Sequence, residues 1–367
     1  MTPSVRIVGE SVDFSGADRL AARVRDEVDS GRSLGTQFAL ARNGSVIAEG
    51  YFGEATPDTR FCMFSATKAL VSATCIPFVE SGALDPSRPV AHYIPEFAGN
   101  GKDHVLVEHV MLMQGGFPYA PMGPKQWATS EGRRERMAGW RLDWEPGTRC
   151  AYHPMAAHWV LAELISTVTG RPYTDVVHET LTSPLGLAPL IGPSVVEDPC
   201  HDVRATGERP PDSAIAEVLG GMHYVMPSTI SLDALLVMNH PATRIAGVPG
   251  GGGFARAGEI ALVYQRLLAL PAVAFEIRNR MVSDTDNVVA NRSLAFVIAG
   301  DDGFAAHRWM AGPSPRAFGH MGAGGQIAWA DPDTGLSFAF VHDTLDQDPR
   351  TDFLRSQDLS TLASACV

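Results

Sequence analysis

The chain has 367 residues, 45% of them hydrophobic and 19% charged, which is enough apolar sequence for one large domain or two closely packed ones. Its formal net charge of -12 argues against nucleic acid or an anionic membrane as the main partner, because both would repel it. We therefore expect a small-molecule substrate.

The start of the chain has neither a basic segment nor an uninterrupted apolar run of signal-peptide length. No later stretch has the roughly 20 apolar residues of a membrane span. We therefore expect a cytoplasmic protein. The five cysteines are scattered and show no C-x-x-C spacing, which favours free buried thiols over disulfides or a zinc site. We expect neither a metal nor a cofactor.

The first predicted elements are a helix and a hairpin. Residues 15–30 place apolar side chains four apart between charges, which predicts an amphipathic helix. The stretches 36–42 and 46–53 flank the pair Asn43-Gly44, whose tolerance of positive φ predicts a tight turn between two strands.

The middle of the chain is predicted to be mostly helical. Pro- and Gly-rich connections separate helical patterns at 65–81, 155–169 and 256–269. The glycine-rich stretch 246–258 lacks the Lys-Ser/Thr pair of a phosphate-binding loop, so we expect a mobile turn there. A second hairpin follows with strands at 325–331 and 336–343, and a helical tail begins at about residue 348.

This order of elements predicts an α+β fold. Both chain ends would build one antiparallel sheet flanked by helices, and a mainly helical region would be inserted between them. We expect one unit over residues 1–367. Residues 1–64 and 286–367 would form its α/β part, and residues 65–285 its helical part.

A serine and a lysine mark the candidate site. Lys68 is one of three lysines in the chain and follows Ser65 by three residues, at the start of an apolar helical run. Positions i and i+3 share one face of a helix, so the two side chains lie side by side. A serine hydroxyl needs a neighbouring base to act as a nucleophile, and burial turns a lysine amine into such a base. The alternative is a capping serine beside a solvated lysine, but the apolar flanks favour a buried lysine.

The segment around this pair reads "FCMFSATKALVSATCIPFVESGALDPSRPVAHYIPEF". It resembles the nucleophile helix of the serine beta-lactamase and penicillin-binding superfamily, in the branch of class C beta-lactamases, D-Ala-D-Ala carboxypeptidases and family VIII esterases. Two later stretches match in the required order. "WEPGTRCAYHPMAAHWVLAELISTVTGRPY" resembles the segment with the Y-x-N motif, and "FGHMGAGGQIAWADPDTGLSFAF" resembles the strand with the K-T-G or H-x-G motif. The resemblance spans roughly residues 36–345 and implies a beta-lactamase-like fold and a single catalytic unit.

The resemblance implies a role for three side chains. Ser65 would be acylated with the help of Lys68, and Tyr152 would be the general base, held near phenolate by Lys68, or a proton shuttle with it. Taken alone, Tyr152 would more often be an ordinary tyrosine at a helix edge. The order of the three motifs favours catalysis.

The third motif implies the substrate-binding strand. His320 and Gly322 occupy its H-x-G positions, and the backbone N–H groups of Ser65 and Ala323 would stabilise the oxyanion. His320 alone would also fit an ordinary turn histidine. The ordered motifs again favour a role in the site.

Departures from the family pattern suggest the substrate. Pro154 stands where the motif has asparagine, and His320 replaces the lysine of K-T-G, which removes a permanent positive charge. Met113 and Gly115 stand where the pattern usually has histidine and serine. These changes and the expected location favour carboxylic esters of small apolar acyl groups over penicillin-like amides. Four aromatic residues are candidates for lining the pocket, but each fits ordinary packing in the core equally well: Phe117, Trp140, Trp144 and Trp159.

Other functions and other serines remain open at this stage. The alternatives are an acyltransferase with the same acyl-enzyme, a beta-lactamase or D-amino-acid peptidase, and a non-enzymatic binding protein. Residues 31–35 fit G-x-S-x-G but follow a helix and precede a strand, so we expect a surface turn. Residues 283–285 resemble an S-D-N motif only weakly, because their flanks do not support it.

Overall fold

The computed structural model describes residues 4–8, 13–219 and 231–367. Within these ranges the strands are β1 (Ser4–Ile7), β2 (Gly35–Arg42), β3 (Ser45–Gly53), β4 (Phe61–Cys62), β5 (Arg204–Thr206), β6 (Phe254–Ala255), β7 (Val297–Ile298), β8 (Phe318–Gly319), β9 (Ile327–Asp331), β10 (Leu336–His342) and β11 (Thr344–Asp346). The α-helices are α1 (Phe14–Asp29), α2 (Thr67–Glu80), α3 (Val90–Tyr93), α4 (Val107–Met111), α5 (Pro124–Trp127), α6 (Ser130–Ala138), α7 (Ala156–Thr169), α8 (Tyr173–Val177), α9 (Asp212–Val218), α10 (Leu232–Leu236), α11 (Pro241–Ala246), α12 (Ala257–Leu267) and α13 (Pro349–Ser364).

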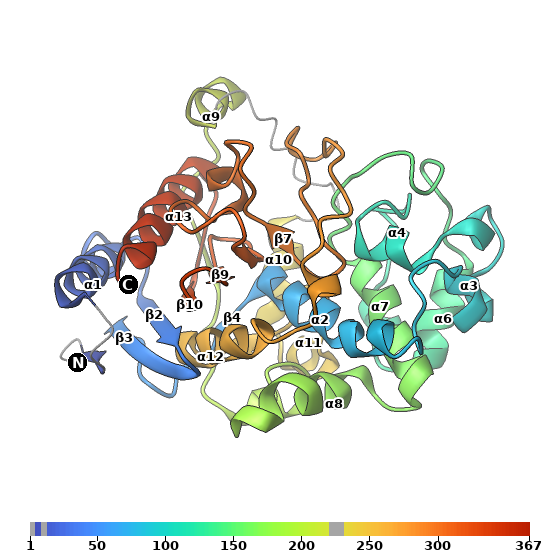
Figure 1. The fold of residues 1–367 in the computed structure, drawn as a ribbon, viewed down its shortest axis with the longest axis horizontal. Helices are drawn as coiled ribbons and strands as arrows, with labels where there is room; N and C mark the ends of the chain where they lie inside the picture. Colours follow the sequence, from blue (N-terminus) through green and yellow to red (C-terminus); the bar gives the residue numbers. More distant parts are fainter. Residues whose placement is uncertain (1–3, 9–12, 220–230) are drawn as a thin grey trace.

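The two ends of the chain meet in one sheet. The order of its strands is β1-β3-β2-β10-β9-β8-β7, and every neighbouring pair is antiparallel. Residues 4–53 supply one half and residues 297–342 the other (Figure 1). The predicted α+β fold is confirmed. The strands β1, β7 and β8 were not predicted, because each is only two to four residues long and shows too little alternation in the sequence.

The predicted first hairpin has the expected turn. Arg42 pairs with Ser45 across it, and Asn43 and Gly44 both have positive φ, at 52° and 75°. Such values suit the two central residues of a tight hairpin turn. In the second hairpin, β10 pairs with β9, beginning with Leu336 opposite Asp331. The other edge of β10 pairs with β2, which joins the two hairpins in one sheet.

Helices cover both faces of the sheet, and β10 shows this most clearly. Its seven residues are all buried. Phe338 and Phe340 face the core shared with α1 and α13, whereas Ala339 and Val341 face the core shared with α12 and α2. A strand that is buried on both faces loses the usual alternation of polar and apolar residues. In Figure 1, α1 and α13 lie side by side over one face of the sheet.

The inserted region contributes α2 and α7, two apolar helices of 14 residues each that pack against one another. The helices α3 to α6 and α8 to α11 of this region have four to nine residues and are joined by irregular segments, whereas α12, with 11 residues, packs against β2 and β10 of the sheet. Residues 220–230 of the predicted helical region lie outside the described residues. Over the described part of the chain, no helix combines the length and the apolar character needed to cross a lipid bilayer.

Candidate active site

Ser65 lies in a single 3-10 turn, Phe64–Ala66, between β4 and α2. The turn is held from behind, because β4 pairs with β6 and the N–H of Met63 donates to the carbonyl of Gly253 at 2.8 Å. Phe64 has a positive φ of 44°, an unfavourable conformation for a bulky residue. The backbone immediately before the serine is therefore fixed in an uncommon shape.

Lys68 lies in the first turn of α2 and is only 1% exposed. Its Nζ atom is 3.0 Å from Ser65 Oγ and donates to the carbonyl of Gly250 at 2.5 Å. Burial, and after it the positive charge of Arg292, lowers the pKa of Lys68 well below its usual range. The amine is therefore able to accept a proton.

The glycine-rich stretch forms the predicted turn, but the turn is buried and belongs to this site. Residues 247–255 are buried, and the loop packs against the start of α2. A Cβ added at Gly253 would come within 2.7 Å of Met63 and Thr67, and one at Gly250 within 2.8 Å of the carbonyl of Pro154. The glycines let the backbone approach closely enough for the Gly250 carbonyl to reach Lys68.

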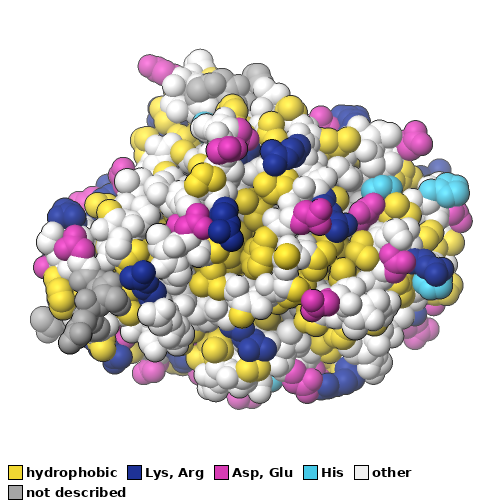
Figure 2. All heavy atoms as spheres, in the orientation of Figure 1, with side chains coloured by type: hydrophobic (Ala, Val, Ile, Leu, Met, Phe, Trp, Pro, Cys, Tyr) yellow, Lys and Arg dark blue, Asp and Glu magenta, His cyan; other side chains and the backbone are white. Residues whose placement is uncertain are grey.

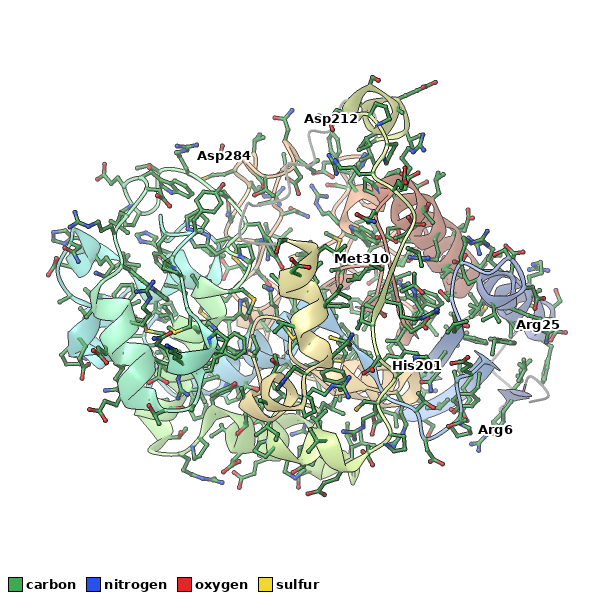
Figure 3. All side chains as sticks on the ribbon, turned by 180° about the vertical axis from the view of Figure 1, so that it is seen from behind. Arg6, Arg25, His201, Asp212, Asp284 and Met310 are labelled. Carbon is green, nitrogen blue, oxygen red and sulfur yellow. The ribbon has the colours of Figure 1, made fainter. Side chains whose placement is uncertain are left out.

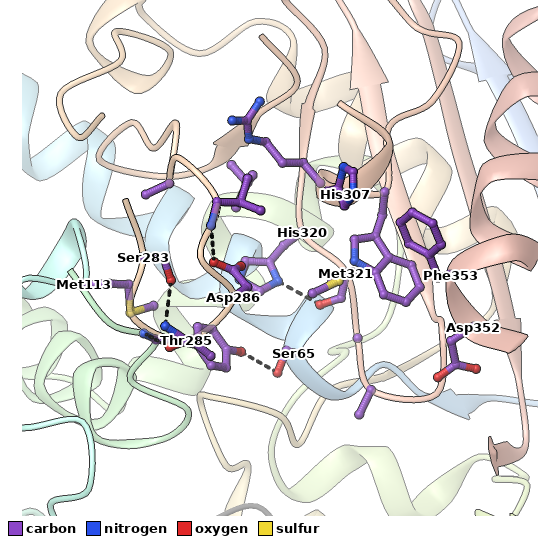
Figure 4. Close-up of a pocket in the computed structure, with 18 of the residues that line it drawn as sticks. Ser65, Met113, Ser283, Thr285, Asp286, His307, His320, Met321, Asp352 and Phe353 are labelled. Carbon is purple, nitrogen blue, oxygen red and sulfur yellow. Dashed lines mark hydrogen bonds between the residues drawn. The ribbon is translucent and has the colours of Figure 1, made fainter. Parts of the chain in front are cut away.

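Tyr152 reaches the serine from an irregular segment four residues before α7 begins. Its hydroxyl donates to Ser65 Oγ at 2.7 Å (Figure 4), and its N–H donates to Thr285 Oγ1 at 2.8 Å. Its ring centroid lies 5.0 Å from Lys68 Nζ. The structure thus brings together the three side chains that the sequence singled out.

The structure corrects the expected protonation of Tyr152. Burial raises the pKa of Tyr152 to about 12, despite the opposing hydrogen bond to Ser65 and the charge of Arg292. The resting side chain is therefore a neutral phenol. Burial also lowers the pKa of Lys68, which weakens any stabilisation of a phenolate by a Lys68 ammonium. Of the two predicted roles, the proton shuttle with Lys68 fits this geometry.

The segment predicted as the substrate-binding strand lies beside the serine, but residues 320–326 form an isolated bridge and a turn between β8 and β9 instead of a strand. Gly322 packs against the carbonyl of Met63, where a Cβ would clash, and its N–H donates to Gln326 at 2.9 Å. Among the described residues, no hydrogen bond uses the N–H of Ser65 or that of Ala323. Both residues line one pocket, so both predicted oxyanion donors are unpaired within it.

His320 is uncharged in this site. Its Nδ1 is 2.7 Å from the carbonyl of Met321, an acceptor, so Nδ1 carries the proton. Burial, followed by the charges of Arg292 and Lys68, lowers the pKa of His320 well below its usual range. His320 therefore provides no positive charge in place of the family's lysine.

Pocket residues lie on both sides of Ser65 (Figure 4). Met113, Ser283 and Thr285 lie on one side of the serine, and Asp352 and Phe353 lie on the other. The apolar lining also includes Leu219, Leu235, Val288 and Trp309. None of the four aromatic residues suggested by the sequence, Phe117, Trp140, Trp144 and Trp159, lines this pocket. Figure 2 shows one face of the molecule, where hydrophobic side chains gather across the middle, between charged residues.

Comparisons with known proteins identify the family of the chain. A family model described as "Beta-lactamase" matches residues 20–362. The chain belongs to the beta-lactamase family. The esterase/beta-lactamase LipL of Mycobacterium tuberculosis is 26% identical over 320 residues, which cover 78% of this chain and 70% of LipL. A penicillin-binding protein homolog from Caulobacter crescentus superposes with a TM-score of 0.77 at 24% identity over 99% of each chain. A family VIII carboxylesterase superposes with a TM-score of 0.77 at 22% identity, over 97% of this chain and 99% of the other.

These matches confirm the predicted superfamily and the beta-lactamase-like fold. Sequence reasoning missed much of the pocket of this beta-lactamase family member, above all the segment 283–292. Ser283 bridges to Cys150, Thr285 supports Tyr152, and Arg292 lines the pocket. Asp284, between Ser283 and Thr285 in the sequence, is exposed and lies at the outer edge of the molecule (Figure 3). It pairs with Arg149 at 2.9 Å. The only signal in the sequence was the S-D-T triplet.

The second serine motif lies in a turn between α1 and β2, as the sequence predicted, and Gly31 and Leu34 are exposed there, but the serine itself is not at the surface. Ser33 is 2% exposed, and its Oγ lies 3.2 Å from Nδ1 of His342. His342 Nε2 in turn lies 2.5 Å from the carbonyl of Gly324, so it is this nitrogen that carries the proton. The serine therefore supports the turn after Ala323 from behind, and it does not line the pocket with Ser65.

The cysteines are free, as predicted. Cys62, Cys75, Cys150 and Cys366 are buried, and Cys200 is partly buried. Burial raises the pKa of the Cys62 and Cys75 thiols to about 12, which keeps them protonated and unreactive. Within the described ranges, no group of three or more His, Cys, Asp or Glu side chains is arranged to hold a metal ion.

Proposed function

We propose that the protein is a serine hydrolase that cleaves carboxylic esters of small molecules through an acyl-enzyme on Ser65. The observation that carries this proposal is the cluster of Ser65, Lys68 and Tyr152. Its hydrogen bonds to Ser65 Oγ, of 3.0 and 2.7 Å, lie at the base of a pocket that also contains the unpaired N–H of Ala323. A nucleophile, a base, a proton donor and an oxyanion donor are the groups that acyl transfer needs.

The acylation step follows from the protonation states. The Lys68 amine takes the proton of Ser65 while Oγ attacks the carbonyl carbon of the ester. The N–H groups of Ser65 and Ala323 stabilise the negative charge on the carbonyl oxygen. When the tetrahedral intermediate collapses, the alcohol leaves with a proton from the Tyr152 hydroxyl, and the Lys68 ammonium returns a proton to Tyr152. Water then attacks the acyl-enzyme, with the same two groups moving its proton to Ser65.

The pocket favours esters over penicillin-like amides. Pro154 offers no carboxamide to hold the amide of an acylamino side chain, and His320 is uncharged where the family's pattern has a lysine. The relatives that match include proteins named as esterases. We extend the proposal to a carboxylesterase of the family VIII kind that acts in the cytoplasm, in line with the composition of the chain.

The test is covalent labelling of Ser65. Wild-type protein is incubated with a p-nitrophenyl ester and with a serine-directed phosphonate, and intact-protein mass spectrometry records the added mass. We expect one label on the wild type and none on Ser65→Ala. Ser283→Ala is the matched control, because Ser283 lines the same pocket, and it should still take up one label, since Ser65 is intact. Labelling of Ser65→Ala at the wild-type rate would refute the assignment.

Product analysis separates hydrolysis from its alternatives. With an added alcohol, an acyltransferase forms a new ester, whereas the proposed hydrolase releases mainly the free acid. Incubation with a penicillin tests the beta-lactamase alternative. We expect slow acylation or none, because the groups that would bind a penicillin side chain and its carboxylate are altered at Pro154 and His320.

A further inference from the structure

The turn that carries the Ala323 N–H is built from glycines. In residues 322–325 the N–H of Gly325 donates to the carbonyl of Gly322 at 3.1 Å. Gly324 has a φ of 73°, a value that favours glycine. A Cβ at Gly324 would also lie 2.5 Å from a backbone carbonyl, so the turn is packed closely from behind. The position of the oxyanion donor therefore depends on what holds this turn.

Two buried side chains hold the far end of the turn. The Gly324 carbonyl accepts a hydrogen bond from Arg355 Nη2 at 2.6 Å and another from His342 Nε2 at 2.5 Å. Both side chains are at most 2% exposed. Burial lowers the pKa of His342, which makes it a neutral donor, whereas an arginine side chain is always charged. Arg355 therefore makes the charge-assisted hydrogen bond to this carbonyl, the stronger kind.

Planar peptide groups connect this carbonyl to the oxyanion site. In a trans peptide group the C=O and the N–H point in opposite directions. The peptide group with the Gly324 carbonyl also contains the Gly325 N–H, which donates to the Gly322 carbonyl. The Gly322 carbonyl in turn shares its peptide group with the Ala323 N–H. We call this chain, from Arg355 through two peptide groups to the Ala323 N–H, the peptide relay.

The peptide relay favours negative charge in the pocket. Hydrogen bonds in a chain strengthen one another, because each one polarises the next group. The positive charge at the Gly324 carbonyl makes the Gly325 N–H a better donor, which in turn makes the Ala323 N–H a better donor to an oxyanion. Arg355 is buried, and electrostatic interactions are stronger where water is excluded.

Carboxylates fix the guanidinium of Arg355 in this place. It donates to Glu27 at 3.0 Å and to Asp352 at 2.5 Å. Glu27 is fully buried and also pairs with Arg23 and Arg32, so it is not the counter-ion of Arg355 alone. Arg355 does not line the pocket itself. It therefore supports the site from behind, through the backbone.

We propose that Arg355 is a positioning residue for the oxyanion site, which holds the turn 322–325 and strengthens the Ala323 N–H as a hydrogen-bond donor. This inference rests on the proposed acyl-enzyme on Ser65, because the oxyanion forms when that serine attacks an ester. Arg355 touches neither the substrate nor the reacting atoms. Its contribution should therefore appear in the stabilisation of the transition state.

The first test measures ester hydrolysis. Arg355→Gln should lower kcat/KM for p-nitrophenyl pentanoate, an uncharged ester, by about 10- to 100-fold. This loss is smaller than the cost of about 10²–10³-fold for deleting an oxyanion donor, because the Ala323 N–H is weakened but still present. Arg355→Lys should recover part of the loss, since an ammonium also donates to a carbonyl. A folded Arg355→Gln with the wild-type kcat/KM would refute the positioning role.

Arg133→Gln is the matched control for stability. Arg133 also forms a buried ion pair, with Glu163 at 2.5 Å, but it does not line the pocket around Ser65. Breaking either pair leaves a buried carboxylate, so both variants should be destabilised, and only Arg355→Gln should lose activity. An equal loss in Arg133→Gln would refute the proposal. If Arg355→Gln does not fold, Arg355→Gln/Glu27→Gln takes its place, because it removes the buried carboxylate together with the cation.

Nuclear magnetic resonance keeps this inference separate from the proposed function. The amide protons of Ala323 and Gly325 are recorded in isotope-labelled protein without any ester. Both should move upfield in Arg355→Gln, because the chain of hydrogen bonds is weaker, whereas the Ser65 amide proton should stay in place. These shifts support the peptide relay even if the wild type hydrolyses no ester. An unshifted Ala323 amide, or an equal shift in Arg133→Gln, overturns it even if Ser65 is acylated.

Discussion

The two walls of the site are built differently. On the serine side, β4, the start of α2 and the loop 247–255 are buried, and glycines bring backbone against backbone. On the opposite side, residues 283–292 form an irregular segment of short bridges that exposes Asp284 and turns Thr285 and Arg292 to the pocket. Close packing fixes the reacting atoms on the first side, whereas polar side chains line the pocket on the second.

The difference separates chemistry from recognition. The pKa of Lys68 depends first on burial, which the packed side supplies, and only second on the charge of Arg292 from the other side. Substitutions on the serine side should therefore affect every substrate and the stability of the protein. Substitutions in the segment 283–292 should change which substrate is preferred.

The largest effect is expected for Lys68→Met. Loss of the base should lower kcat by roughly 10²–10⁴-fold for every ester. The variant should also unfold at a higher temperature. Because the pKa of Lys68 is lowered on folding, the unfolded chain binds a proton that the folded chain releases, which destabilises the wild type below the usual lysine pKa. Lys125→Met, at an exposed lysine, is the control and should change neither property. A Lys68→Met variant with a lower unfolding temperature would contradict the uncharged amine.

A smaller effect is expected for the glycine loop. A Cβ at Gly250 would lie 2.8 Å from the Pro154 carbonyl and 3.2 Å from Met155 Sδ, so Gly250→Ala should lower the free energy of unfolding by about 1–3 kcal/mol. It should also lower kcat for all esters alike, because the carbonyl that receives the Lys68 hydrogen bond would shift. Gly251→Ala is the matched control, since its nearest contacts would be at 3.8 Å. Equal losses in the two variants, by denaturant unfolding and ester assays, would argue against close packing at Gly250.

The sequence predicts the packed side better than the other side. Ser65 and Lys68 belong to one helical turn, so their spacing alone places them together, and Tyr152 and His320 were found through ordered motifs. The contribution of the glycine loop was missed, because a glycine's fit depends on what packs against it from elsewhere in the chain. Ser33 shows the same limit, since its partner His342 is 309 residues away.

The segment 283–292 gives almost no local signal. It has neither the length nor the alternation of a regular strand, and its bridges pair with residues far from it in the chain, such as Cys150. An arginine in a polar stretch of sequence is expected on the surface. Only the three-dimensional structure shows that Arg292 lines the pocket and that the four aromatic candidates Phe117, Trp140, Trp144 and Trp159 do not.

The pH dependence of activity tests whether the two walls interact. The positive charge of Arg292 adds to burial in lowering the pKa of Lys68, and the amine must be uncharged to act as a base. In Arg292→Gln the pKa of Lys68 should rise, so the acid limb of kcat/KM for the uncharged pentanoate should move to higher pH. Arg278→Gln, which removes an exposed arginine that pairs with Glu276 outside the pocket, should leave the limb in place. An unshifted limb in Arg292→Gln would mean that the two walls act independently.

The smallest effect concerns stability on the Asp352 side of the pocket. Burial raises the pKa of Asp352 from 3.8 to about 7. The positive charge of Arg355 opposes this rise only in part, because Arg355 also pairs with Glu27. The folded chain therefore binds this proton more tightly than the unfolded chain, and the contribution of Asp352 to stability falls as pH rises from about 4 to about 7.

Asp352→Asn removes that titration, so the stability of the variant relative to wild type should increase between pH 5 and pH 7.5 in denaturant unfolding. Asp302→Asn is the opposite case. The hydrogen bonds from Arg308 lower the pKa of Asp302 to about 2, so its contribution is lost only in more acidic solution and the difference from wild type should stay constant over the same range. Parallel curves for Asp352→Asn and wild type would show that Asp352 is ionised throughout, and the wall beside Phe353 would then carry a full negative charge opposite Arg292.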